Sequence, residues 1–180
     1  MQILLTGAPG AGKSTVLRRT LALLGAAPGG FYTGFAPDGR RLCLWPAEGP
    51  PCWDRAHTVA LREGGTCRAL PGAFDRVGPP ILAGNRTGLV VMDELGNVER
   101  DEAEFQRAVL ACLDSPALVL GVVKPRRAGT WLEALAARPD AAVVEVTQAG
   151  RDGLPEVLAG MIRKEGAWRD ESRYTTGKGL

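Results

Sequence analysis

The sequence predicts an α/β fold with a mostly parallel central sheet, helices on both faces of that sheet and a small β-hairpin insertion. Short apolar runs alternate with longer segments whose apolar residues recur at helical spacing, as in repeated βαβ units. A glycine-rich loop follows the first strand and an acidic pair follows a later one. At 180 residues, we expect a single domain over residues 1–165 and a polar, loosely held tail over 166–180.

The first half of the chain combines a strand–loop–helix unit with a hairpin. The apolar run at 3–5 predicts a strand, and 16–24 carries an apolar stripe at helical spacing. A β-prone run at 31–33, a strong turn and an alternating segment at 41–45 together predict a β-hairpin. Prolines interrupt residues 46–88, which predict only a short strand near 58–61 and a helix within 74–82.

The second half alternates between strands and helices. Continuous apolar runs predict core strands over residues 89–92, 117–123 and 142–146. Apolar residues at helical spacing predict helices over residues 101–114, 131–137 and 154–162. Such a sheet binds ligands at the carboxyl ends of its parallel strands, so the motifs that follow those strands should converge in space.

The loop after the first strand has the spacing of a phosphate-binding loop, G-x-x-x-x-G-K-[ST]. It consists of Gly7, Ala8, Pro9, Gly10, Ala11, Gly12, Lys13, Ser14 and Thr15, and we call it the P-loop. Glycines let the backbone curl so that N–H groups face phosphate oxygens, and the helix N-terminus that follows favours anions. Lys13 is expected to reach the β- and γ-phosphates and Ser14 to ligate Mg²⁺. The sequence therefore predicts a P-loop NTPase fold with Mg²⁺ as cofactor.

The acidic pair Asp93-Glu94 ends the apolar run at 89–92 and should lie beside the P-loop. Asp93 is placed to hold Mg²⁺ directly or through water, as a Walker-B aspartate does. Glu94 points the other way and is placed to orient or deprotonate an attacking water. The pair favours hydrolysis of a bound nucleoside triphosphate.

Phosphoryl transfer also needs a cation near the γ-phosphate, where charge develops. Lys124, Arg126 and Arg127 follow the strand at 117–123, at the same end of the sheet as the other motifs. Arg126 and Arg127 are therefore catalytic candidates, and a solvated basic loop is the alternative.

Composition limits the partners and the location of the protein. The net charge is only +2, which gives no support for nucleic-acid binding. No apolar run reaches the roughly 18 residues of a membrane span, and the N-terminal segment reads as a strand rather than a signal peptide. We expect a cytoplasmic monomer that binds neither membranes nor nucleic acid.

Two smaller groups of residues leave alternatives open. A zinc site would have to combine Cys43, Cys52, His57 and Cys67, whose spacings fit no common pattern, so free thiols are expected. Three aromatic residues either line the substrate site or pack in the core: Tyr32, Phe35 and Trp131.

Further motifs are spread over most of the chain. They are GFYT at 30–33 with GRR at 39–41, DELGNVE at 93–99, and VT, RD and LP between residues 146 and 155. Together with the P-loop, they resemble the THEP1-type nucleoside-triphosphatase family of P-loop proteins. The resemblance implies hydrolysis of ATP, GTP and other nucleoside triphosphates with broad base tolerance. It also implies that Lys13, Ser14 and Thr15 bind phosphate and Mg²⁺, that Asp93 belongs to the metal site, and that Glu94 is the base.

Three features depart from the family pattern. Asn97 replaces a lysine, Gly34-Phe35 replaces an acidic pair, and the segment 66–82 is shorter than usual. If the missing lysine stabilises charge in the family, turnover here should be slow or depend on Arg126 or Arg127.

Two other functions compete with hydrolysis. The P-loop also resembles that of adenylate kinases, which favours a small nucleotide or nucleoside kinase that transfers the γ-phosphate to an acceptor. Glu94 argues against a kinase, because activating water beside the donor would cause wasteful hydrolysis. The second alternative is a nucleotide-dependent switch or binding module, but the sequence contains no recognisable switch segment or partner-binding motif.

Overall fold

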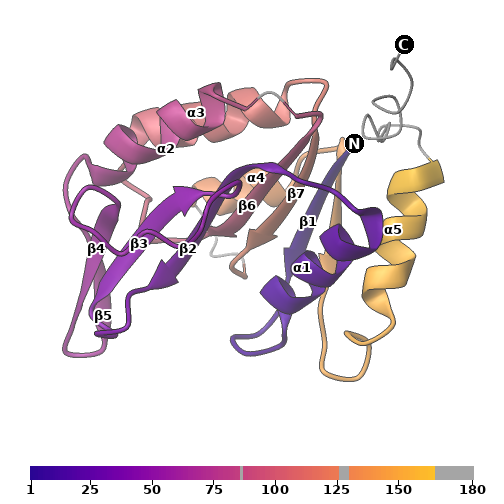
Figure 1. The fold of residues 1–180 in the computed structure, drawn as a ribbon, viewed down its shortest axis with the longest axis horizontal. Coiled ribbons are helices and arrows are strands. Elements are labelled where there is room, and N and C mark those ends of the chain that lie inside the picture. The colour runs from indigo at the N-terminus through magenta and orange to yellow at the C-terminus, as the bar shows by residue number, and fades with distance from the viewer. Residues whose placement is uncertain (86, 126–129, 165–180) are drawn as a thin grey trace, which may run out of the picture.

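The computed structural model describes residues 1–85, 87–125 and 130–164. These residues build an eight-stranded sheet with strand order β5-β4-β3-β2-β6-β7-β1-β8 (Figure 1). The parallel part comprises β1 (Gln2–Thr6), β2 (Gly29–Phe35), β6 (Leu89–Leu95), β7 (Leu118–Val123) and β8 (Ala141–Glu145). Beyond β2 the sheet continues antiparallel through β3 (Arg41–Pro46), β4 (Thr58–Glu63) and β5 (Thr66–Ala69). The predicted α/β class is confirmed.

Helices cover both faces of the sheet, as predicted (Figure 1). One face carries α1 (Lys13–Leu24) and α5 (Leu154–Lys164). The other carries α2 (Ala73–Ala83), α3 (Ala103–Leu113) and α4 (Trp131–Ala136). In the described part of the chain, no helix is both long and apolar enough to span a bilayer.

Alternate residues of the central strands enter two separate cores. In β1, Leu4 packs with the α2, α3 and α4 side, whereas Ile3 and Leu5 pack with the α1 and α5 side. Both faces of these central strands are therefore buried, which is why their sequences are continuous apolar runs rather than alternating apolar and polar residues. On the α2–α3 face, the Phe105 ring centroid lies 5.3 Å from that of Phe74. Each fully buried side chain of this size contributes roughly 1.5–3 kcal/mol.

The structure differs from the sequence-based expectation at two strands. β5 was not predicted, because its residues are small or polar and two of them, Thr66 and Arg68, are exposed. The strand expected as a fourth core strand is β8, which pairs with β1 at the edge of the sheet and is only partly buried. The prediction of a core strand was wrong here because the apolar run of Ala141 to Val144 in this edge strand has a composition like that of a central strand.

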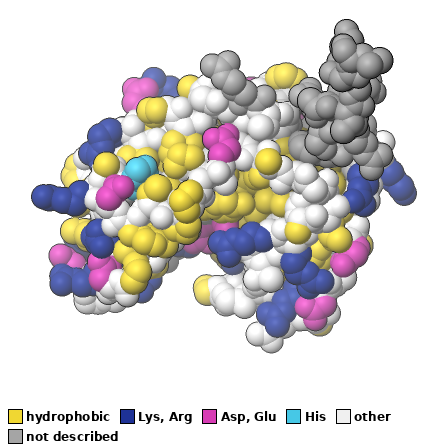
Figure 2. Space-filling model, in the orientation of Figure 1, with side chains coloured by type: hydrophobic (Ala, Val, Ile, Leu, Met, Phe, Trp, Pro, Cys, Tyr) yellow, Lys and Arg dark blue, Asp and Glu magenta, His cyan; other side chains and the backbone are white. Residues whose placement is uncertain are grey.

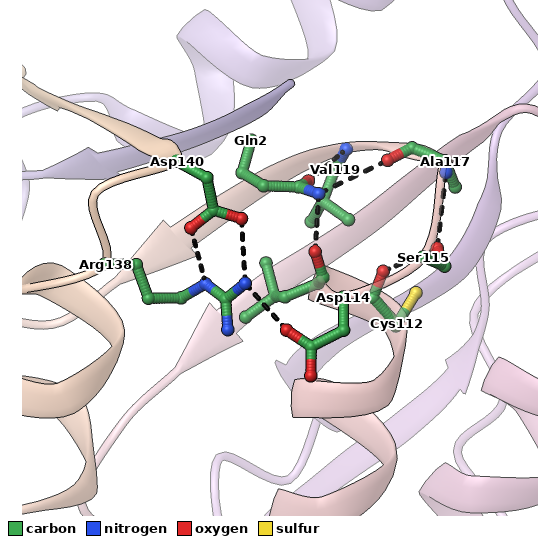
Figure 3. A network of polar contacts seen from close by, with 9 residues as sticks. Gln2, Cys112, Asp114, Ser115, Ala117, Val119, Arg138 and Asp140 are labelled. Atoms are coloured by element: carbon green, nitrogen blue, oxygen red, sulfur yellow. Dashed lines mark hydrogen bonds and ion pairs between the residues drawn. The ribbon is translucent and has the colours of Figure 1, made fainter.

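A polar network fastens the amino ends of the parallel strands (Figure 3). The Gln2 amide donates to the Leu113 carbonyl at 2.7 Å and accepts the Val119 N–H at 3.0 Å, linking β1, α3 and β7. Nearby, the Arg138 guanidinium bridges Asp114 at 2.7 Å and Asp140 at 2.8 Å. Side-chain hydrogen bonds and ion pairs thus stabilise the amino edge of the sheet. The loops of the candidate site lie at the opposite, carboxyl edge.

Candidate functional site

The P-loop curls between the end of β1 and the start of α1. Gly7, Gly10 and Gly12 have φ angles of 138°, 76° and 101°, values that residues with a Cβ adopt rarely. A Cβ at Gly7 would also lie 2.4 Å from the Val146 carbonyl oxygen, and one at Gly12 would lie 3.1 Å from Arg151 Cδ. The loop is thus shaped by its glycines and packed against the segment that follows β8.

Lys13 begins α1 and is almost completely buried. Its Nζ donates hydrogen bonds to the carbonyl oxygens of Gly7 and Ala8, both at 3.0 Å. The ammonium group is therefore held inside the curve of the P-loop, where the sequence predicts phosphate binding.

Ser14 and Asp93 meet across the carboxyl edge of the sheet. The Ser14 hydroxyl, in the first turn of α1, donates to Asp93 Oδ1 in β6 at 2.8 Å, although β7 separates β6 from β1, the strand that precedes α1. The other carboxylate oxygen of Asp93 lies 3.9 Å from the Arg18 guanidinium. Asp93 is 3% exposed, and burial raises the pKa of its carboxyl, while Ser14 and Arg18 oppose that rise. A cation at this position would stabilise the charged carboxylate.

These two oxygen donors fit the Mg²⁺ that a P-loop implies. Mg²⁺ prefers oxygen ligands and keeps several waters, so it needs few protein ligands besides the substrate phosphates. A hydroxyl and a buried carboxylate 2.8 Å apart supply such a pair. Ser14 and Asp93 would therefore hold the metal, with no dedicated cluster of acidic residues.

Glu94 follows Asp93 in β6 and pairs with a different cation. Glu94 Oε1 lies 2.9 Å from Lys124 Nζ, at the end of β7. The backbone N–H of Glu94 donates to the Thr33 hydroxyl at 3.1 Å, which ties β6 to β2 at this point. The side chain of Glu94 is thus oriented by an ion pair and its backbone by a hydrogen bond.

A cleft of about 600 Å³ runs along the P-loop. Figure 2 shows the molecule hollowed along the lower edge of the view, between the hairpin strands and the P-loop side. Its lining combines P-loop residues with side chains from β2, β4 and β6 and the segment after β7: Pro9, Gly10, Gly12, Lys13, Ser14, Thr15, Phe35, Arg62, Glu94, Lys124 and Pro125. The predicted phosphate loop and the predicted base thus line the same cleft.

A smaller cavity of about 140 Å³ adjoins the cleft and shares Glu94 and Lys124 with it. Glu99 lines this cavity and is 3% exposed. Burial raises the pKa of Glu99 to about 7, even though its carboxylate accepts the backbone N–H of Gly96. Glu99 is therefore a buried carboxyl that titrates near neutral pH.

Of the other site residues predicted from the sequence, some line this cleft and some do not. Arg126 and Arg127 fall outside the described residues, as does the predicted tail over 166–180. Phe35 lines the cleft, whereas Trp131 packs beside the core and donates its ring N–H to the Gly96 carbonyl at 3.1 Å. Asn97 lines a different cavity of about 560 Å³, so position 97 is not part of the P-loop cleft lining.

The residues of the zinc alternative have other partners. Cys43 Sγ lies 3.7 Å from the Thr58 hydroxyl, and His57 Nδ1 lies 2.8 Å from Asp54. Over the described ranges, no group of three or more His, Cys, Asp and Glu side chains is arranged to hold a metal ion.

Sequence reasoning missed several side chains at the site. Thr33 and Glu99 lie inside the GFYT and DELGNVE segments, so those motifs were a usable signal for both. Arg18, which lies 3.9 Å from Asp93, and Arg62, which lines the cleft, belong to no motif, and the sequence carries no signal for either position.

Known proteins resemble this chain over most of its length. The family model described as NTPase matches residues 64–159. Nucleoside-triphosphatase THEP1 of Natranaerobius thermophilus is 31% identical over 177 residues, which cover 91% of this chain and 97% of that protein. The cancer-related nucleoside-triphosphatase homolog of Mus musculus is 29% identical and covers 87% of this chain and 94% of its own length. The crystal structure of THEP1 from Aquifex aeolicus shares the fold, with a TM-score of 0.73 at 22% identity over 89% of this chain and 98% of that one. The chain therefore belongs to the THEP1 family of nucleoside-triphosphatases.

Proposed function

We propose that this chain hydrolyses nucleoside 5'-triphosphates to the diphosphate and phosphate, with Mg²⁺ and with broad base tolerance. One observation carries the proposal: the P-loop and Glu94 line the same cleft, and Ser14 in that cleft donates a hydrogen bond to Asp93 at 2.8 Å. The names of the relatives, which describe nucleoside-triphosphatases, support the same reaction.

Each group has a distinct role in this proposal. The P-loop amides and Lys13 hold the β- and γ-phosphates, and Ser14 and Asp93 hold Mg²⁺. When bound, Mg²⁺ neutralises charge on the phosphate oxygens. Glu94 accepts a proton from water as the water oxygen bonds to the γ-phosphorus. The bond from the γ-phosphorus to the bridging oxygen breaks at the same time, and that oxygen leaves with the nucleoside diphosphate.

The lining of the cleft supports the proposed base tolerance. Its described lining is the P-loop together with Arg62, Glu94, Lys124 and two apolar residues. These groups suit phosphates, which every nucleoside triphosphate shares. Discrimination between bases requires donors and acceptors that match a base edge.

The decisive experiment measures phosphate release from ATP, GTP, CTP and UTP by the purified protein with Mg²⁺, with and without nucleoside or nucleoside-monophosphate acceptors. We expect release from all four without an acceptor, with kcat/KM values within about tenfold of one another, and loss of release in EDTA. Nucleotide loss that requires an acceptor would make the protein a kinase. Activity on one base alone would disprove the broad tolerance.

A further inference from the structure

Arg62 and Phe35 meet at the cleft although they lie on strands that are not neighbours. Arg62 belongs to β4 and Phe35 ends β2, with β3 between them in the sheet. The Arg62 guanidinium carbon lies 3.5 Å from the centroid of the Phe35 ring. The backbone N–H of Arg62 also donates to the Arg40 carbonyl at 2.7 Å, which fixes where its side chain starts. An exposed arginine is thus held against an aromatic face.

Both residues line the P-loop cleft on the hairpin side. They share this cleft with Lys13, Ser14 and Glu94, and they also line the smaller cavity that adjoins Glu94. Glu94, as the proposed base, belongs beside the γ-phosphate, and Arg62 lines both the cleft and the smaller cavity together with it. Its guanidinium therefore belongs to the group of cations that a triphosphate would meet.

The other cations of the cleft already have polar partners. Lys13 donates to two P-loop carbonyls, and Lys124 pairs with Glu94 at 2.9 Å. For Arg62, no carboxylate of the described residues lies within ion-pair distance. An aromatic face restrains a guanidinium without neutralising it, since the ring carries no net charge. Arg62 therefore keeps a full positive charge available to an anion.

We propose that Arg62 is a catalytic residue that contacts γ-phosphate oxygens and stabilises the charge that develops on them in the transition state, with Phe35 as its positioning residue. This inference rests on the proposed hydrolysis and names the γ-phosphate cation that the sequence left unassigned. Arginine suits the role because its planar fork of N–H donors matches two phosphate oxygens and stays protonated throughout. The bonds made and broken are those of the proposed reaction, and no proton moves to or from Arg62.

The first test compares steady-state kinetics of Arg62→Ala and Arg62→Lys with those of wild type. We expect Arg62→Ala to lower kcat about 100-fold, as removal of one transition-state donor does, with KM changed less than about threefold. Arg62→Lys should retain part of the rate, because it keeps the charge but loses the fork. The matched control is Arg68→Ala, an exposed arginine on the adjoining strand β5 that does not line the P-loop cleft.

A binding measurement separates a catalytic contact from a structural one. ADP with Mg²⁺ and aluminium fluoride imitates the transition state, whereas ADP with Mg²⁺ alone does not. Calorimetry should show that Arg62→Ala binds ADP like wild type but loses most of the added affinity for the aluminium fluoride complex. Arg68→Ala should keep that added affinity. If Arg62→Ala retains it, or keeps kcat within about twofold of wild type, the inference is wrong.

Phe35 is tested through its dependence on Arg62. Phe35→Leu should lower kcat about two- to fivefold, which is what a cation–π contact at an exposed site is worth. The same substitution in the Arg62→Ala background should have no further effect on kcat. An equal effect in both backgrounds would contradict the positioning role. A wild-type protein that released no phosphate would disprove the proposed function itself, whereas an active wild type with an equally active Arg62→Ala would disprove only this inference.

Discussion

Glu94 lies inside a strand rather than in a loop, because β6 continues to Leu95. Thr33 accepts its backbone N–H, and Lys124 faces its carboxylate at 2.9 Å. Together these contacts fix both the backbone and the carboxylate of Glu94. A base held in this way needs little reorganisation before it meets a water molecule.

Glu94→Gln should therefore lower kcat at least about tenfold and leave nucleotide affinity nearly unchanged, since the amide keeps the shape but cannot accept the proton. The measurement is steady-state phosphate release together with calorimetric binding of a non-hydrolysable ATP analogue. Glu63→Gln, on the exposed end of β4, is the control and should behave like wild type. Unchanged turnover in Glu94→Gln would remove Glu94 from the mechanism.

Glu99 should make the free energy of unfolding depend on pH. Its pKa rises from 4.5 to about 7 because burial disfavours the carboxylate. Between these pH values the folded protein holds a proton that the unfolded chain has lost. The free energy of unfolding should therefore fall as pH rises from about 4.5 to about 7, and this loss should be constant above that range.

Glu99→Gln should remove this slope and raise the free energy of unfolding at pH 8 by up to ~3 kcal/mol, with little change at pH 4.5. The neutral amide oxygen can still accept the Gly96 N–H. Urea unfolding at both pH values tests the prediction, with the exposed Glu104→Gln on α3 as control. A variant that keeps the wild-type slope would show that another group causes it.

At the residue scale, the sequence could predict those parts of the site that lie within a motif. The P-loop and Asp93-Glu94 have fixed local spacing, and both follow recognisable apolar strands. The Arg62–Phe35 stacking and the Lys124–Glu94 ion pair join residues about 30 positions apart. No local pattern encodes such pairs, because they depend on the order of strands in the sheet.

At the element scale, α2 and α3 cap each other's N-termini. The Glu102 carboxylate accepts the backbone N–H groups of Gly72 at 3.0 Å and Asp75 at 3.2 Å, at the start of α2. In return, Asp75 Oδ1 accepts the N–H of Phe105 at 2.8 Å, in the first turn of α3. Unpaired N–H groups at both helix starts are thus satisfied from the neighbouring helix.

Glu102→Ala should lower the free energy of unfolding by about 1–2 kcal/mol, because it leaves two N–H groups of α2 without their acceptor. Glu102→Gln should cost less, since one oxygen remains. Glu104→Ala, also at the start of α3 but exposed, is the matched control. Urea unfolding at pH 7 measures all three, and a Glu102→Ala variant as stable as Glu104→Ala would contradict the capping role.

Strands and helices could be predicted from the sequence where their burial requires a regular pattern of apolar residues. The prediction was wrong for strands that are only partly buried. β6 and β7 are dry on both faces, so their apolar runs identified them. β5 is only partly buried and leaves no such pattern. The helix predicted within 74–82 is α2, which forms even though Pro79 and Pro80 lie inside it, because burial of residues such as Phe74 and Leu82 offsets two missing N–H donors.

At the scale of the whole molecule, one edge of the parallel sheet carries stabilising contacts and the other carries the candidate site. The amino edge is fastened by the network around Gln2 and Arg138 (Figure 3). The carboxyl edge carries the P-loop, Asp93 and Glu94. Parallel topology makes this division possible, since every strand presents its carboxyl end to the same side. The site is therefore assembled only when the whole sheet is folded, and a nucleotide that binds there should stabilise the entire molecule.

This coupling can be measured as a thermal shift. With Mg²⁺ and a non-hydrolysable ATP analogue at about 100 times its dissociation constant, binding adds about 2.7 kcal/mol to the free energy of unfolding. For a chain of this length, that corresponds to a rise in Tm of about 5–10 °C. Lys13→Ala should lose this rise, measured against its own Tm without nucleotide, because Lys13 lies inside the curve of the P-loop. Lys164→Ala, at the end of α5, should keep it. An equal rise in Lys13→Ala would mean that the nucleotide binds elsewhere on the sheet.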